Sequence, residues 1–161
     1  MTNEDSRDGA QDDLRAIAYL SLVRRPMTVA ELDRLVIDAN AHNAMQGVTG
    51  ALLFDGQRFF QYFEGPAAGV AVVYERIRRS SKHTIVSEVF NGPVPRRYFS
   101  QWNMASRRAG SDTLLELGTA RWLQVKSGME AQFAESEGLR RLVAFWGDGG
   151  PVLPSAPAEP A

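Results

Sequence analysis

Polar side chains fall in places where the sequence pattern expects apolar ones. In an extended chain the run RFFQYFEG (58–65) puts Gln61 on the same face as Phe59 and Phe63. The opposite face of this run carries the charged residues at its ends, so the face of Gln61 is expected to be the more apolar one. An unpaired amide there would cost roughly 1–3 kcal/mol. The sequence therefore predicts a hydrogen-bonding partner for Gln61.

Three other polar residues are expected at the same interface. Tyr19 lies on the apolar face of an earlier strand-like run, and His42 and Asn43 continue the apolar stripe of a helix-like segment. A phenol, two amides and an imidazole could converge there between helices and sheet. Such a set suits a polar ligand with an apolar body, although the spacing does not identify that ligand.

Each residue also has an ordinary structural interpretation. Asn43 could cap the end of its helix, Tyr19 could be a core residue bonded to a carbonyl, and Gln61 could lie on a sheet edge. The binding interpretation is favoured because inward polar groups need partners and these groups complement one another.

The elements that would position these residues alternate between strands and helices. The expected βαββαββ order gives a ferredoxin-like α+β fold, with a mixed five-stranded sheet and two helices on one face. Thr28 and Glu31 form a capping box, and the dipeptide Asp55-Gly56 predicts a β-hairpin. The predicted strands are 15–23, 47–54, 57–64, 83–90 and 100–107, and the two helices run from Thr28 to about Met45 and from Pro66 to about Ser81.

The C-terminal part is expected to add two helices, 112–125 and 129–146, that cover the other sheet face, including Phe60 and Tyr62. The predicted organisation is a core at 13–108 and a helical extension at 109–147. Polar or Pro-, Gly- and Ala-rich composition predicts disordered tails at 1–12 and 148–161.

Composition excludes several function classes. The 161 residues include 44% hydrophobic and 23% charged residues, with a net charge of −1, so a nucleic-acid partner is not expected. No stretch is apolar enough for a membrane span and no signal peptide is recognisable, which predicts a cytoplasmic location. The absence of cysteine excludes disulfides, thiolate metal sites and cysteinyl adducts, and no dinucleotide-binding, P-loop or GxSxG motif is present.

Four stretches of the chain resemble the BLUF family of flavin-binding blue-light sensors. The resemblance covers about residues 14–108, and its most specific part is the pattern G[VI]TG…G…F.Q..EG of the hairpin. The stretches are AYLS (18–21), AHNAMQGVTGALLFDGQRFFQYFEG (41–65), RIRRSSKH (76–83) and RRYFSQWNM (96–104).

The resemblance implies a flavin between the two helices, with Tyr19 and Gln61 as the photoactive pair at one edge of the ring. Asn43 would bond the pyrimidine side, with His42 beside it. Trp102 and Met104, on the fifth strand, would carry the signal, and Trp102 could compete with Tyr19 as electron donor. The apolar walls would be Leu35, Phe59, Phe63 and Ile77, and the outer contacts Arg76 and His83.

The implied chemistry is a switch without turnover. Tyr19 would give an electron and then a proton to the excited flavin, and Gln61 would rotate or tautomerise and so redirect its hydrogen bonds. A reversible red-shifted state would follow. The cofactor is expected to be FAD, with FMN or riboflavin as alternatives.

One motif departs from the family pattern. The family commonly has D-x-R-H at the end of the second helix, whereas this chain has Ser80-Ser81-Lys82-His83, which removes an acid and replaces arginine by lysine. Contacts to the flavin tail are therefore expected to differ.

Signal output is expected to pass to a separate downstream protein, with a homodimer also plausible, because 109–161 is too short for an enzymatic output domain. Two alternatives use the same fold. One is a small ferredoxin-like enzyme, such as a monooxygenase or an acylphosphatase-like hydrolase, and the other is a flavin-free assembly domain.

Overall fold

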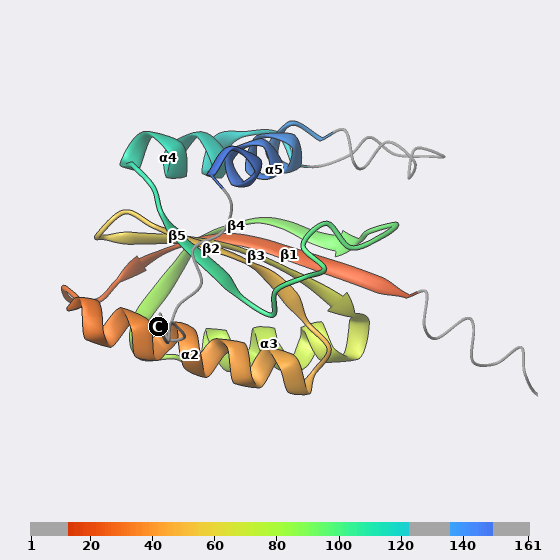
Figure 1. Ribbon diagram of the computed structural model, residues 1–161, viewed down its shortest axis with the longest axis horizontal. Helices are drawn as coiled ribbons and strands as arrows, with labels where there is room; N and C mark the ends of the chain where they lie inside the picture. The colour runs from red at the N-terminus through yellow and green to blue at the C-terminus, as the bar shows by residue number, and fades with distance from the viewer. Residues whose placement is uncertain (1–12, 123–135, 150–161) are drawn as a thin grey trace, which may run out of the picture.

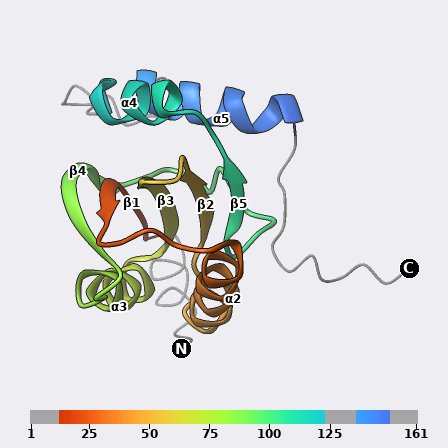
Figure 2. The ribbon, with the colours of Figure 1, turned by 90° about the vertical axis from the view of Figure 1, so that its left-hand side faces the viewer.

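The computed structural model describes residues 13–122 and 136–149 and consists of a sheet between two helical layers (Figure 1). Helices α2 and α3 lie side by side on one face of the sheet, and α4 and α5 lie on the other (Figure 2). The elements are β1 (Leu14–Val23), α2 (Val29–Met45), β2 (Thr49–Phe54), β3 (Arg58–Pro66), α3 (Ala67–Arg78), β4 (His83–Pro93), β5 (Ala105–Arg108), α4 (Ser111–Thr119) and α5 (Glu137–Gly149).

The strand order is β4-β1-β3-β2-β5. Strand β1 pairs antiparallel with β3 and β4, β2 pairs antiparallel with β3, and β5 pairs parallel with β2. This is a ferredoxin-like arrangement with a fifth strand added beside β2, which confirms the predicted mixed five-stranded sheet.

Helix α2 begins at the predicted capping box. The Thr28 hydroxyl accepts a hydrogen bond from the Glu31 amide at 3.0 Å, and the Glu31 carboxylate accepts one from the Thr28 amide at 2.9 Å. Both bonds satisfy N–H groups that have no partner inside the first helical turn. The helix ends at Met45, as predicted.

The β2–β3 hairpin is also as predicted. The Asp55 carboxylate accepts hydrogen bonds from the amides of Gln57 and Arg58 at 2.9 and 2.8 Å. Gly56 has a φ of 105°, which lies in a region that side-chain-bearing residues rarely adopt. The turn therefore needs this Asp-Gly pair. The turn in its place sets the register of β3 against β2.

Several predicted boundaries were wrong. The helix predicted at 112–125 ends at Thr119, α5 begins at Glu137 although 129–146 was predicted, and β4 continues to Pro93 past the predicted end at residue 90. Helix α3 ends at Arg78, three residues before Ser81, because the Ser80 hydroxyl accepts the Lys82 amide at 3.1 Å and so forms a turn. Strand β5 starts only at Ala105. Trp102 and Met104 therefore precede the strand.

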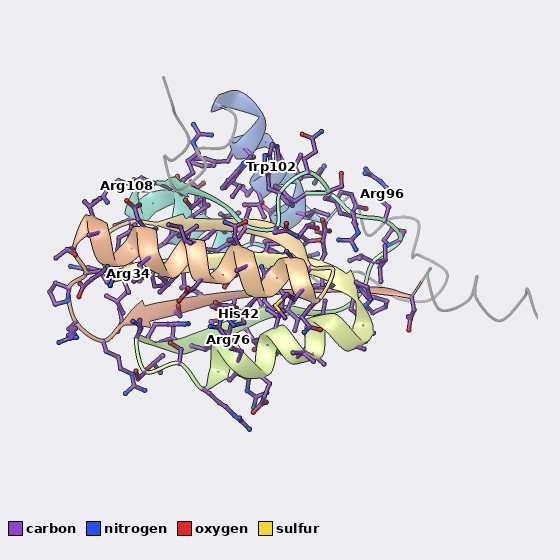
Figure 3. All side chains as sticks on the ribbon, turned by 60° about the horizontal axis from the view of Figure 1, so that its bottom comes forward. Arg34, His42, Arg76, Arg96, Trp102 and Arg108 are labelled. Carbon is purple, nitrogen blue, oxygen red and sulfur yellow. The ribbon has the colours of Figure 1, made fainter. Side chains whose placement is uncertain are left out.

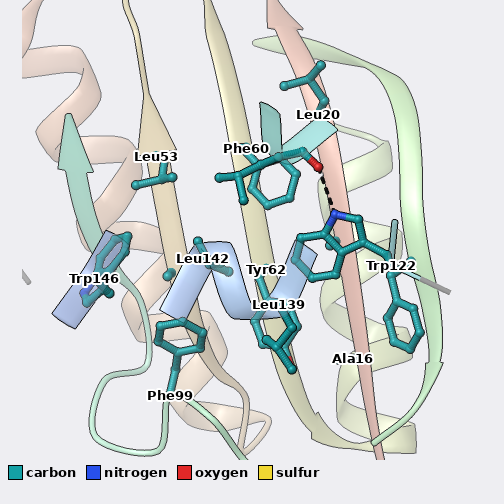
Figure 4. Close-up of a cluster of buried hydrophobic side chains, with 14 of the residues drawn as sticks. Ala16, Leu20, Leu53, Phe60, Tyr62, Phe99, Trp122, Leu139, Leu142 and Trp146 are labelled. Atoms are coloured by element: carbon teal, nitrogen blue, oxygen red, sulfur yellow. Dashed lines mark hydrogen bonds between the residues drawn. The ribbon is translucent and has the colours of Figure 1, made fainter. Parts of the chain in front are cut away.

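Alternation along β3 divides the interior into two cores. Phe59, Gln61 and Phe63 face α2 and α3, whereas Phe60 and Tyr62 face α4 and α5. Figure 4 shows the second core, where side chains of α4, α5 and the segment after α4 pack on the sheet. The prediction that C-terminal helices cover this face is confirmed.

Trp122 is the largest fully buried side chain of this second core. Its ring stacks on Phe60 and Tyr62, with centroid distances of 5.7 and 6.2 Å, and its Nε1 donates to the Leu117 carbonyl at 2.8 Å (Figure 4).

Parts of the predicted organisation lie outside the described residues: the N-terminal tail 1–12, the helical positions 123–125 and 129–135, and the C-terminal tail from 150 onward. Residues 148 and 149, assigned to that tail, end helix α5. Among the helices that the structure describes, none is both long and apolar enough to span a bilayer.

Candidate functional site

Tyr19 and Gln61 lie directly opposite each other in the β1–β3 pair, at the centre of the sheet. Both are buried, with 2% and 5% of their surface exposed. The Tyr19 hydroxyl donates a hydrogen bond to Oε1 of Gln61. Gln61 therefore has a hydrogen-bonding partner, as its position on an apolar face predicts. The two polar groups satisfy each other.

The other end of the Gln61 amide contacts Met104. Nε2 of Gln61 donates to the Met104 sulfur at 3.6 Å, and Met104 is fully buried beside Val36 and Phe59. A thioether is a weak acceptor, so this N–H is held less strongly than Oε1. The amide is therefore fixed firmly at one end and weakly at the other.

Met104 and Trp102 belong to different cores. Met104 packs in the layer of α2, whereas Trp102 is half-buried against the core under α4 and α5. Residues two apart in the predicted fifth strand would point the same way, but neither residue lies in a regular strand. Met104 is the residue that points toward Gln61.

Asn43 is buried at the end of α2, and its Nδ2 donates to the Asn103 carbonyl at 2.9 Å. One turn earlier, Asn40 donates from Nδ2 to the Met104 carbonyl at 2.9 Å. Asn40 was not among the predicted site residues. The signal that could have found it is its position three residues before Asn43, on the same side of the helix.

His83 closes the site on the β4 side. Its ring stacks on Tyr19, with a centroid distance of 6.1 Å, and meets the Phe59 ring edge-on. Its Nδ1 is buried and has no hydrogen-bond partner among the described residues. Burial, and then the nearby Arg24 charge, lower the pKa of His83. A neutral imidazole with one unused nitrogen thus faces the interface.

A cavity of about 410 Å³ lies beside His83, between α3 and β4. Its wall combines apolar groups with cationic and hydroxyl groups. The lining residues are Arg24, Tyr74, Ile77, Arg78, His83, Thr84, Ile85 and Glu88.

The predicted apolar walls lie around the pair on two sides. Phe63 packs with Tyr19, and Ile77 of α3 lies against the same cluster. Phe59 packs with Met104, and Leu35 of α2 lies against that cluster. The four side chains therefore belong to the two clusters on the Tyr19–Gln61 face of the sheet.

Tyr74 is a further aromatic group near the pair that was not among the predicted site residues. Its ring centroid lies 6.3 Å from that of Tyr19, and its hydroxyl donates to the Glu88 carboxylate. Burial raises the pKa of both phenols, with a contribution from Tyr74 at Tyr19 and from Glu88 at Tyr74. Tyr19 therefore holds its proton firmly in the resting protein.

Two predicted contacts remain at the surface. His42 is exposed and bonds through Nδ1 to the Asp38 carbonyl of its own helix, and Arg76 is exposed on α3. Figure 3 looks onto the helical layer, where His42 and Arg76 lie along the line at which α2 and α3 face each other. The structure does not bring either one to the Tyr19–Gln61 pair.

Comparison with known protein families matches residues 14–105 to BLUF, described as sensors of blue-light using FAD. The chain belongs to the BLUF family. The match includes every element from β1 to the start of β5, together with the Tyr19–Gln61 pair.

The chain spans less than a quarter of the length of the curated relatives that it matches here. The chain is 37% identical over 94 residues to photoactivated adenylate cyclase subunit beta of Euglena gracilis, which covers 58% of this chain and 11% of the relative. It is 34% identical over 91 residues to the blue light- and temperature-regulated antirepressor BluF of Escherichia coli K12, covering 56% of this chain and 23% of that protein.

Solved structures agree on the fold. The dark-state structure of the BLUF protein BlrB has a TM-score of 0.60 at 24% identity, covering 84% of this chain and 98% of that one. A Klebsiella pneumoniae BlrP1 structure with FMN and cyclic diGMP has a TM-score of 0.57 at 25% identity, covering 84% of this chain and 35% of that one.

The family membership gives the general function. The BLUF domain is a flavin-binding photosensor, not a catalytic domain, and it signals to effector domains or partner proteins. The predicted photoreceptor function is therefore confirmed at this level, in preference to the enzymatic and flavin-free alternatives.

Proposed function

We propose that this chain is a cytoplasmic blue-light receptor that binds FAD, switches through Tyr19 and Gln61, and passes its state to a separate protein. The observation that carries the proposal is the buried hydrogen bond from the Tyr19 phenol to the Gln61 amide. It joins a redox-active side chain to a group that can exchange donor for acceptor.

The residues on this face fit a flavin. Tyr19, Gln61 and Asn43 offer buried hydrogen-bonding groups, and the Nδ1 of His83 is a buried polar atom without a partner among the described residues. Phe63, Leu35, Phe59 and Ile77 would flank the ring, with His42 and Arg76 at its outer edges.

A bound flavin supplies blue-light absorption and, once excited, oxidising power toward a neighbouring aromatic side chain. Tyr19 is the side chain that gives up the electron. Its phenol would then release a proton to Oε1 of Gln61, which already accepts its hydrogen bond, and Nε2 of Gln61 would give up a proton toward the reduced flavin, so that the amide stays neutral. The high pKa of the resting phenol keeps this proton in place until Tyr19 is oxidised.

Gln61 converts this event into a new hydrogen-bond pattern. Either rotation or tautomerisation of its amide changes which neighbour receives an N–H, without a backbone movement. The weak contact from Nε2 to the Met104 sulfur is the first to be lost. Because the chain contains no cysteine, no thiol adduct forms and the switch reverts in the dark.

The test is spectroscopic. Purified full-length protein should carry flavin, and blue light should shift its absorption to the red, with recovery in the dark. Gln61→Leu and Tyr19→Phe should each remove the shift and retain the flavin. Protein that binds flavin but does not respond to light, or a normal shift in either variant, would refute the proposal.

The choice of FAD is tested by binding. The family description names FAD, and the BlrP1 structure contains FMN. Arg24 and Arg78 at the cavity beside His83 suit the phosphate groups of either cofactor, although the acid of the family motif is Ser80 here. Extraction and chromatography of the bound flavin should give FAD, and tighter binding of riboflavin would contradict this assignment.

The output is proposed to reach a separate protein, by analogy with the Escherichia coli relative, whose name describes an antirepressor. Signal transfer would pass through Trp102, Met104 and the C-terminal helices, either from a monomer or from a homodimer. Pull-downs with purified protein under blue light and in the dark should recover different partners, and size-exclusion chromatography in both states would measure the oligomeric state.

A further inference from the structure

Three consecutive backbone carbonyls before β5 are each bonded to the α2–β2 part of the fold. The Trp102 carbonyl accepts the Gly50 amide at 3.1 Å. The Asn103 and Met104 carbonyls accept side-chain amides of Asn43 and Asn40, each at 2.9 Å. The 102–104 segment therefore has no strand ladder of its own, and helix α2 satisfies two of its three carbonyls.

The orientation of Asn40 is fixed within its own helix. Besides the bond to Met104, its Nδ2 donates to the Val36 carbonyl one turn earlier, at 3.2 Å. An amide nitrogen carries two hydrogens, so both are used. The bond to Val36 directs the second hydrogen toward the Met104 carbonyl, which is the arrangement expected of a side chain that holds a neighbouring segment.

The two polar contacts of Met104 lie on different parts of the residue. Asn40 bonds its backbone carbonyl, and Gln61 bonds its sulfur at 3.6 Å. The side chain is fully buried beside Val36. Fixing the backbone at the carbonyl limits where the sulfur can lie, so the contact with Gln61 depends on the bond from Asn40.

We propose that Asn40 is a positioning residue for the light switch: it fixes the backbone of Met104 so that the sulfur stays in contact with the Gln61 amide. The proposal rests on the proposed photoreceptor function. Among the described residues Asn40 has no hydrogen bond to Tyr19 or Gln61, and it acts through Met104. Its expected effect is on the return of Gln61 to its resting orientation, because the Met104 contact favours that orientation.

The first test is the rate of dark recovery. Asn40→Leu removes both N–H groups at nearly constant size and should slow recovery about fivefold, while the bound flavin and the size of the red shift are retained. The matched control is Asn91→Leu, since Asn91 is exposed on β4 and bonds only Arg15 among the described residues. The control should recover at the wild-type rate.

A double-mutant cycle separates positioning from a general structural effect. In a Met104→Leu background the sulfur is absent, so Asn40→Leu should no longer change the recovery rate. An unchanged or faster recovery in Asn40→Leu alone, or the same slowing in both backgrounds, would overturn the proposal. Should Asn40→Leu not fold, Asn40→Ser keeps a bond within the helix but is too short to reach Met104.

A second measurement does not depend on light. Amide hydrogen exchange of full-length protein kept in the dark should be faster around residues 102–106 in Asn40→Leu than in wild type or Asn91→Leu. If wild-type protein gives no red shift, the photoreceptor proposal fails, and exchange alone then decides whether Asn40 holds this segment. Equal exchange in all three proteins would overturn the inference by itself.

Discussion

Glu64 is a carboxylic acid that is fully buried on the sheet face covered by α4 and α5. Its oxygens accept hydrogen bonds from the Tyr62 hydroxyl at 2.8 Å and from the amides of Tyr98 and Phe99 at 2.7 and 2.6 Å. Burial raises the pKa of Glu64, and these hydrogen bonds and the Arg97 charge oppose the rise. Glu64 thus holds the start of the loop that leads to the 102–104 segment.

Acceptor oxygens, and not the charge, are what this site needs. Glu64→Gln should change the free energy of unfolding by less than about 1 kcal/mol, because one oxygen can accept both amides and the Tyr62 hydroxyl can reverse its role. Glu64→Leu leaves these donors unpaired and should cost on the order of 3–5 kcal/mol. Urea unfolding of both variants measures the difference, and equal losses would mean that the charge is required.

Glu64→Gln is also expected to change how the free energy of unfolding depends on pH. Because the pKa of Glu64 is higher in the folded protein, the folded state binds more protons between the ordinary and the raised value. The Glu64 contribution to the free energy of unfolding therefore falls as pH rises through this interval. Urea titrations across it should show that fall in wild type and a smaller one in Glu64→Gln.

His83 changes the free energy of unfolding with pH in the opposite direction to Glu64. Its pKa is lowered from 6.5 in the folded protein, so between the lowered value and 6.5 the unfolded chain binds the extra proton. The free energy of unfolding should therefore rise with pH through this window and stay at its higher value above it. His83→Phe keeps an aromatic ring against Tyr19 and should remove this rise, as measured by thermal unfolding between about pH 5 and 8. A rise that persists in the variant would assign it to another group.

At the scale of elements, helix α5 depends on one glycine. A Cβ added at Gly138 would lie 2.1 Å from the Trp122 ring, which is fixed by its bond to Leu117 and by its stack on Phe60. Gly138→Ala must therefore displace either the helix or the indole, at a cost of about 1–3 kcal/mol.

The matched control is Gly110→Ala, because no atom lies within 4 Å of the position where its Cβ would be. Tryptophan fluorescence and urea unfolding should change for Gly138→Ala and stay near wild type for Gly110→Ala. Equal effects would mean that the indole does not limit this position.

Elements whose signals are local could be predicted from the sequence. The capping box of Thr28 and the turn at Asp55-Gly56 are defined by residues within a few positions of each other, and both were confirmed. Strand β5 was predicted too long because the carbonyls before it bond to residues 52 to 64 positions away. No local pattern carries that information.

The residues of the candidate site could also be predicted only in part. Two-residue periodicity put Tyr19 and Gln61 on one face, and the antiparallel register then brought them together. Glu64 was interpreted as a strand end because the sequence does not indicate which loop covers it. Asn40 was missed although it lies three residues before Asn43, because its contact with the Met104 carbonyl joins positions 64 residues apart.

At the scale of the whole molecule, the sheet separates the Tyr19–Gln61 layer from the layer of α4 and α5 (Figure 2). The 102–104 segment contacts both, since Met104 lies in one core and Trp102 against the other. β5 follows directly, and its Arg107 donates to the Phe145 carbonyl of α5 at 2.8 Å and lies over the Phe145 ring. A continuous set of contacts therefore joins Gln61 to α5.

Arg107 is the contact to remove in order to separate the switch from this helix. Arg107→Leu should leave the red shift and its recovery unchanged, because Arg107 lies in the other layer from Gln61. Blue light should alter amide exchange in α5 of wild type and do so less in the variant. The control is Arg108→Leu, whose side chain lies near Phe54 and has no contact with α5 among the described residues. An unaltered light response of α5 in Arg107→Leu would exclude this route.

The register of β1 against β3 has a consequence for how such a switch can vary among related chains. Side chains alternate between faces at every residue, so a slip of one position would move Gln61 to the opposite face from Tyr19. Alignment of the pair is therefore all-or-none, and small sequence changes cannot adjust it by degrees. Met104 lies outside any ladder, where its position can change continuously. Gradual evolution of the lifetime of the light-induced state is thus expected at the side chains that hold Met104, and not within the paired strands.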